Sequence, residues 1–419
     1  MSANRMRAAD THRILAAQAG RGFAYGLGAV LLGVTLDRRG FSGTQAGIVL
    51  AAVLAGTVVS SLLLARWGDR WGRRRCYLVL YLALGVAGVA FAFSGNLWLL
   101  AAVALTGALS PEVVESGPFT SLEQAMLATD LSGRARLRGF GMYNAVATAA
   151  GSLGALAAGG LGPLRRVWAA PDERAFLVFA PVALVGAALA ARLSPGVEAE
   201  DASRVGPRLP SPSRARVRGL AALFAVDSFG GGFVVQSFIA YWLAVRFHAS
   251  VGLLGVTFFV VGLLQTASML VAPRIAERSG LLPTMVFTHL PSNLLLAAMA
   301  FARSLPVAVG LLLARVALSQ MDVPTRQAYV MALVAPSERT AAAAYTNTAR
   351  YVVRPAGPAL AGASQSIALG APFLIAGVIK ASYDLVLWQR FRGLELASDT
   401  TAPASTVAAR PGPSRGAAS

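Results

Sequence analysis

The sequence is poor in the residues from which soluble enzymes build their sites. Only 13% of its 419 residues are charged, against about 25% in typical soluble proteins. It has one cysteine, Cys76, which excludes an internal disulfide, and three scattered histidines without metal-ligand spacing. The sequence contains no G-x-x-x-x-G-K-[ST] phosphate loop and no evident pairing of a nucleophile with a base. These absences argue against an enzyme, an ATP-driven pump, a catalytic residue, a metal or a cofactor.

Hydrophobic residues, by contrast, make up 56% of the chain and lie in long runs, with a mean hydropathy of +0.60. A helix needs about 20 apolar residues to cross a ~30 Å hydrocarbon layer. The runs therefore predict an all-α membrane protein of twelve transmembrane helices, near residues 14–36, 44–66, 76–95, 97–127, 139–161, 174–194, 218–243, 251–274, 281–302, 305–334, 340–367 and 370–390.

The formal net charge of +18 follows from topology and gives no reason to expect nucleic acid. With both termini placed in the cytoplasm, most basic residues fall on the cytoplasmic side, as the positive-inside rule requires. Lys380 is the only lysine among 37 basic residues. This arginine-rich usage favours a bacterial protein, and hence the inner (cytoplasmic) membrane.

The chain divides into two similar parts. Residues 194–217, rich in Pro, Ser and Arg, form a predicted cytoplasmic linker between six-helix bundles at 1–193 and 218–392. Residues 393–419 have a similar composition and are predicted to be a disordered cytoplasmic tail. The stretch "ARWGDRWG" matches "PRIAERSG" 208 residues later, and further matches occur at offsets of 203 and 206. We therefore predict two parallel repeats related by an axis along the membrane normal.

The stretch "ARWGDRWGRRR" between the second and third spans resembles the loop signature of the major facilitator superfamily, Gly-x-Leu-x-Asp-Arg-x-Gly-Arg-Arg. The resemblance implies two pseudo-symmetric six-helix bundles, with helices 1, 4, 7 and 10 lining a central cavity. It also implies that the loop latches the bundles together in the outward-facing state. The conformational residues are then Asp69, Arg70, Gly72 and Arg73, with Glu277 and Arg278 in the second repeat.

Charged residues inside the spans indicate where a polar path runs. Each costs at least ~2.5 kcal/mol at the bilayer centre and normally faces a cavity or a partner. The candidate path for substrate and protons comprises Arg21, Glu112, Glu115, Asp227, Arg315 and Asp322. A cytoplasmic gate is predicted from two oppositely charged, repeat-related pairs, Arg21 with Asp227 and Glu123 with Arg326. The alternative is that each charge pairs within its own half. Lys380 and Asp384 are expected to neutralise each other.

Helix-breaking residues fall at matching places in helices 4 and 10. Pro111, Gly117 and Pro118 are expected to interrupt helix 4, and Asp322-Val323-Pro324 helix 10. Broken helices at matching places in two repeats indicate a transport site. Glu112 and Glu115 lie one turn apart, and one of them, or Asp322, is a candidate for proton coupling. The alternative is that the glutamates pair with arginines and only hold the shape.

Together these features predict a secondary transporter that moves a small organic solute by alternating access. Proton-coupled efflux is favoured by a resemblance to drug–proton antiporters. The alternative is proton-coupled uptake of an organic anion or metabolite, with Arg21, Arg315 or Arg326 as its counter-ion. The expected partners are the substrate, protons and the lipid bilayer, and the expected oligomeric state is a monomer.

Overall fold

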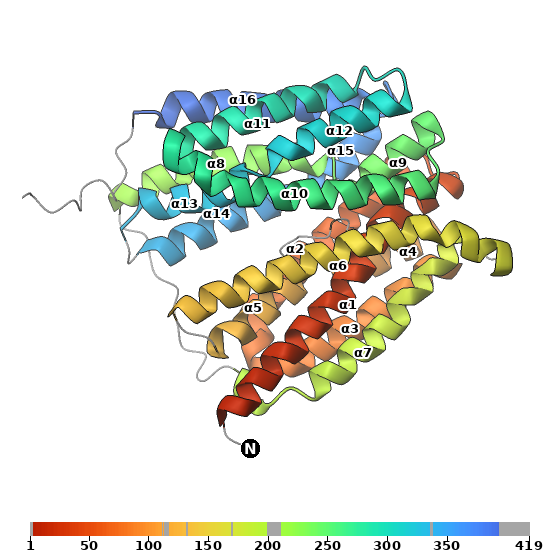
Figure 1. Cartoon of the computed structure of the whole chain (residues 1–419), viewed down its shortest axis with the longest axis horizontal. Coiled ribbons are helices and arrows are strands. Elements are labelled where there is room, and N and C mark those ends of the chain that lie inside the picture. The colour runs from red at the N-terminus through yellow and green to blue at the C-terminus, as the bar shows by residue number, and fades with distance from the viewer. Residues whose placement is uncertain are drawn as a thin grey trace, which may run out of the picture.

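The computed structural model describes residues 3–110, 112, 117–130, 133–168, 171–198, 211–335 and 338–393. Glu115, residues 199–210 of the predicted linker and the predicted tail from residue 394 onward lie outside these ranges. The described residues form helices joined by short turns, without a strand (Figure 1).

The first half of the chain contributes seven α-helices and two short 3₁₀ helices. Their bounds are α1 Ala3–Arg38, α2 Gly43–Trp71, α3 Arg73–Phe93, α4 Leu97–Ala104, α5 Pro118–Asp130, α6 Gly133–Trp168, η1 Asp172–Val178, α7 Phe179–Ala191 and η2 Pro195–Val197.

The second half contributes nine α-helices. Their bounds are α8 Ser211–Gly232, α9 Gln236–Phe247, α10 Val251–Ser279, α11 Leu281–Met299, α12 Leu305–Ser319, α13 Asp322–Leu333, α14 Arg339–Val353, α15 Ala356–Ser364 and α16 Ala371–Phe391. Within the described ranges, nine helical segments are long and apolar enough to cross a membrane. The full count of twelve spans remains a prediction.

The two repeats are visible in matching helix ends. Helices α2 and α10 are both 29 residues long, and each begins after a capping serine, Ser42 or Ser250. Each also ends at a glycine, Gly72 or Gly280, with φ of 88°. An L-residue with a side chain is strained at such a φ, which explains why glycine stands at both positions. The caps and the terminating glycines are separated by the same 208 residues as the sequence match.

The helix breaks only partly follow the prediction. Helix 10 breaks at Gln320–Met321, directly before Asp322, as expected. Helix 4 breaks earlier than expected, after Ala104. Gly107 follows with a φ of 71° and packs so closely against Gly56 that an added Cβ would lie 2.5 Å from its carbonyl oxygen. The span expected at 218–243 lies within one candidate membrane segment, Arg214–Phe247, and both this span and the one expected at 340–367 contain a break. The first is divided into α8 and α9 after three consecutive glycines, and the second into α14 and α15 at Pro355.

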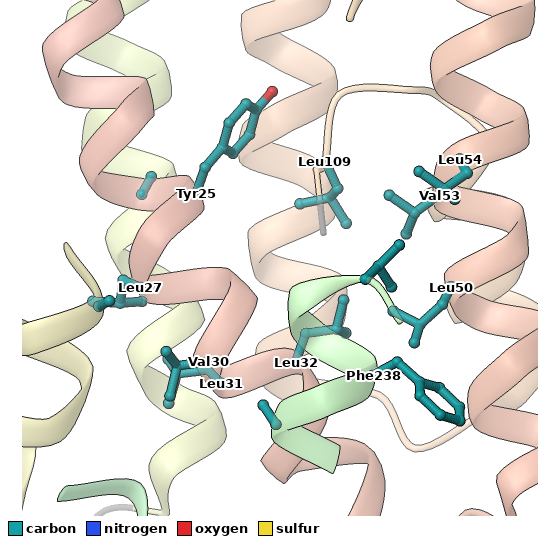
Figure 2. Close-up of a cluster of buried hydrophobic side chains, with 14 of the residues drawn as sticks. Tyr25, Leu27, Val30, Leu31, Leu32, Leu50, Val53, Leu54, Leu109 and Phe238 are labelled. Carbon is teal, nitrogen blue, oxygen red and sulfur yellow. The ribbon is translucent and has the colours of Figure 1, made fainter. Parts of the chain in front are cut away.

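The bundles meet at the end of the molecule opposite the N-terminus (Figure 1). There Gly33 of α1 packs against the backbone of α9, and Gly47 of α2 packs against Pro358 and Gly362 of α15. At the same end, Gly159 of α6 contacts the start of α10. We call these three contacts the glycine seam. Beside it, Leu32 of α1, Leu50 of α2 and Phe238 of α9 lie in one buried cluster (Figure 2).

The outer surface of the bundles is apolar. Large hydrophobic side chains point away from the protein on several helices, among them Val79, Leu82 and Val86 of α3, Leu184 of α7 and Leu270 of α10. Each is more than 60% exposed. A water-soluble monomer rarely shows so much apolar surface, whereas a bilayer accepts it.

Candidate transport crevice

A cavity of about 190 Å³ lies between the two halves, with α2 on one side and α14 on the other. Its polar lining consists mainly of hydroxyl groups, and Arg354 is the one charged residue among the described residues that line it. The lining residues are Leu54, Thr57, Val58, Ser61, Leu62 and Ala65 of α2, Ser121 of α5, and Thr348, Tyr351, Val352, Arg354 and Pro355. A small apolar pocket with a few convergent polar groups is the usual form of a ligand site.

An ion pair crosses between the halves beside this cavity. Arg354 Nη2 donates to Glu112 Oε2 at 2.6 Å, and the two side chains are 17% and 24% exposed. Glu112 lies in the non-helical stretch between α4 and α5, where Ser110 Oγ accepts its backbone N–H and donates to its carbonyl oxygen. The break in helix 4 therefore brings a carboxylate to the face of the opposite half.

A second charged group is buried inside the first half. Arg21 of α1 pairs with Glu123 of α5, and both side chains are almost fully enclosed. Tyr77 and Tyr143 donate hydrogen bonds to the same carboxylate, and Gln18 accepts one from Arg21. A small cavity of about 30 Å³ adjoins Arg21 and is lined by Thr57, which also lines the larger cavity. That volume suffices for about two water molecules.

The corresponding group in the second half is larger. Asp227 of α8 pairs with Lys380 of α16 and lies 3.7 Å from Arg326 Nη1. Arg326 also pairs with Asp322 at 2.6 Å, within α13.

The predicted four-residue gate is not what the structure forms. Arg21 pairs with Glu123 and Arg326 with Asp227, so each oppositely charged pair stays within its own half. The alternative, that each charge finds a partner in its own bundle, is the observed one. The two pairs still occupy equivalent positions of the repeat, between helices 1 and 4 in the first half and helices 7 and 10 in the second. The signs of the charges are reversed between the halves, because helix 1 carries the arginine and helix 7 the aspartate.

The expected pairing of Lys380 with Asp384 is also wrong. Lys380 binds Asp227, and Asp384 instead accepts hydrogen bonds from the side chain of Asn293 and contacts His289 Nδ1 at 2.8 Å. The spacing of four residues places Lys380 and Asp384 on one face of α16, but each finds a closer partner on a packed neighbour. Sequence analysis missed His289 and Asn293 because their partners lie about 90 residues away.

Two buried arginines of the second half, Arg315 and Arg350, form no ion pair within the described residues. The Nε atoms of Arg315 and Arg350 are buried and find no hydrogen-bond partner among the described residues. Neither guanidinium takes part in any ion pair of that part of the chain. The carboxylates that act on Arg315 are Glu112 and Asp227, one from each half. Of the predicted path, the structure places Glu112 beside the crevice on Arg354, and Arg21, Asp227 and Asp322 in buried pairs. Arg315 is buried, with Glu112 and Asp227 as the carboxylates that act on it.

The side-chain contacts described for the end of α2 and the loop after it lie within the first half of the chain. Asp69 accepts a hydrogen bond from Arg73 Nε at 2.9 Å and is 45% exposed, while Arg70 is exposed. Glu198, beyond η2, accepts the backbone N–H groups of Arg73 and Arg74 and thereby caps α3. In the second repeat, Glu277 and Arg278 are exposed at the end of α10. The described contacts show no latch to the opposite half in this conformation, and the latch role remains a prediction.

A sequence profile of the Major Facilitator Superfamily matches residues 14–358. The chain belongs to this superfamily. It is 26% identical over 410 residues to an uncharacterized membrane protein of Saccharomyces cerevisiae, covering 89% of this chain and 92% of the yeast protein.

Solved transporters share the fold. The nucleoside transporter NupG superimposes with a TM-score of 0.69 at 14% identity, covering 90% of this chain and 97% of the other. A D-xylose–proton symporter gives 0.67 at 14% identity, with the same two coverages. The chain is therefore a multi-pass membrane transporter of the major facilitator fold.

Proposed function

We propose that this protein is a secondary active transporter that moves a small organic solute by alternating access through the crevice between α2 and α14. The observation that carries the proposal is the asymmetry of the bundle contact. The halves touch backbone to backbone at the glycine seam, whereas further along a cavity lies between them beside the ion pair of Glu112 with Arg354. Both termini are proposed to be cytoplasmic, in which case the crevice opens inward.

We further propose that transport is coupled to protons and directed outward, across the inner membrane of a bacterium, by a monomer. Glu112 is the favoured coupling group because its carboxylate joins the two halves beside the cavity. Uptake is the alternative direction, and Arg354 in the lining of the crevice favours an anionic substrate in that case.

A disulfide between α2 and the end of α15, next to the Gly47 contact of the glycine seam, can test alternating access. An added Cβ at Gly43 would lie 3.0 Å from the Cβ of Gln365 in the opposite half. Disulfide-linked Cβ atoms normally lie about 3.5–4.5 Å apart, so a small adjustment permits a bond. In a Cys76→Ser background, Gly43→Cys with Gln365→Cys should block transport by proteoliposomes under an imposed proton gradient. Reductant should restore it.

A matched pair within one half provides the control. An added Cβ at Gly85 lies 3.2 Å from the Cβ of Ala183, both in the first bundle. This disulfide should form equally well and leave transport unchanged. Undiminished transport with the seam fully cross-linked would contradict alternating access. Reversing the proton gradient during the same assay distinguishes efflux from uptake.

A further inference from the structure

The one charged side chain among the described residues that line the crevice is a cation, the guanidinium of Arg354. Arg354 lines the cavity and is bound by Glu112, whereas Arg315 and Arg350 have buried Nε atoms without a partner in the described part of the chain. Carboxylates act on both from a distance, Glu112 and Asp227 on Arg315 and Asp227 and Asp322 on Arg350, but charged groups inside a membrane are costly and normally face a cavity or a partner. Arg350 lies one turn before Arg354 on α14, so the two start from the same face of the helix. The arrangement therefore favours a negatively charged group arriving from solution.

The cavity also limits the size and nature of the ligand. Its volume of about 190 Å³ exceeds the 150 Å³ that holds a benzene ring in an engineered protein cavity. Leu54, Val58 and Leu62 offer apolar contacts on α2, and Thr57 and Tyr351 add hydroxyl groups. Such a lining suits an aromatic or branched aliphatic body with one charged end.

We propose that the substrate is a small organic monoanion whose acidic group replaces the Glu112 carboxylate on Arg354. The inference rests on the proposed function and names the substrate class of the same site. A guanidinium presents a planar fork that binds carboxylate, phosphate or sulfonate groups in a bidentate manner.

This exchange ties substrate binding to movement of the halves. Glu112 belongs to the first bundle and Arg354 to the second, so the resting pair holds the bundles together beside the cavity. An anion bound to Arg354 sets Glu112 free and removes that link. A cationic solute, in contrast, is repelled by Arg354 and therefore does not displace Glu112 from it.

The test compares six-membered aromatic probes that differ in charge. Binding of benzoate, phenylphosphate, benzenesulfonate, neutral benzamide and cationic benzylamine to the purified full-length protein is measured by calorimetry and by protection against thermal unfolding. We expect at least one of the three anions to bind, and benzamide and benzylamine not to bind. The relative affinities of the three anions show which acidic group the site prefers. Binding of benzylamine in place of the anions, or of none of the probes, would overturn the inference.

Two variants separate the roles of the ion pair. Arg354→Gln should weaken anion binding roughly 10- to 100-fold, the loss of hydrogen bonds to a charged group. Glu112→Gln removes the competitor and should tighten it several-fold. Arg303→Gln, exposed near the start of α12, is the control and should change nothing. Unaltered anion binding by Arg354→Gln would refute the proposal, whereas failure of the seam disulfide to block transport would refute the transporter mechanism instead.

Discussion

Replacing Glu123 by leucine should destabilise the protein by about 3–5 kcal/mol, because it leaves Arg21 charged and enclosed. Arg21 is 3% exposed and Glu123 is fully buried, so solvent cannot replace the lost carboxylate. Breaking a buried ion pair by removing one partner typically costs this much, whereas replacing both partners by apolar residues is often neutral. The change also removes the carboxylate that accepts hydrogen bonds from Tyr77 and Tyr143, which as donors keep longer contacts to Tyr81 and Thr120.

The measurement is the free energy of unfolding in detergent micelles, titrated with sodium dodecyl sulfate. The double variant Arg21→Met with Glu123→Leu should recover most of the lost stability. Asp69→Asn is the control, since it removes an exposed ion pair worth about 1 kcal/mol or less. If Glu123→Leu costs no more than Asp69→Asn, or if the double variant is no more stable than the single one, the argument from burial is refuted.

Three further changes have definite expected outcomes. Lys380→Met should cost about 3 kcal/mol or more of unfolding free energy because Asp227 loses its paired cation; a loss below 1 kcal/mol would show that Arg326 and His289 suffice. Gly33→Ala should drive α1 away from α9, since its Cβ would lie 2.3 Å from a carbonyl oxygen, and spin-label distances across the seam should lengthen. Gly72→Ala should cost about 1 kcal/mol because its φ is 88°, and an unchanged midpoint of unfolding would argue against that conformation.

Much of the fold is predictable from the sequence because its signals are local. Apolar runs, positive loops and repeated short motifs each depend on a few neighbouring residues. The repeated stretches that end at Gly72 and Gly280 are an example, since the sequence match places these two glycines at the same position of the repeat and both have a φ of 88°. The break directly before Asp322 was predicted for the same reason, whereas helix 4 ends earlier than expected, after Ala104.

The charge partners were harder to predict because they depend on helix rotation. A residue's depth follows from counting along the chain, but the neighbour it faces depends on how the helix is turned. Arg21 and Asp227 lie at matching depths, yet each points into its own bundle. Arg354 had no assigned role, although its contact with Glu112 joins the halves, because no local pattern relates residues 242 positions apart.

The glycine seam has a mechanical consequence. Where backbone meets backbone without intervening side chains, no rotamers must be reset and little surface has to be rewetted when the contact parts. Small residues let helix backbones approach closely, so such a contact can part and re-form without rearrangement of large side chains. A transporter that opens and closes in every cycle can do so faster when the contact between its halves involves few side chains.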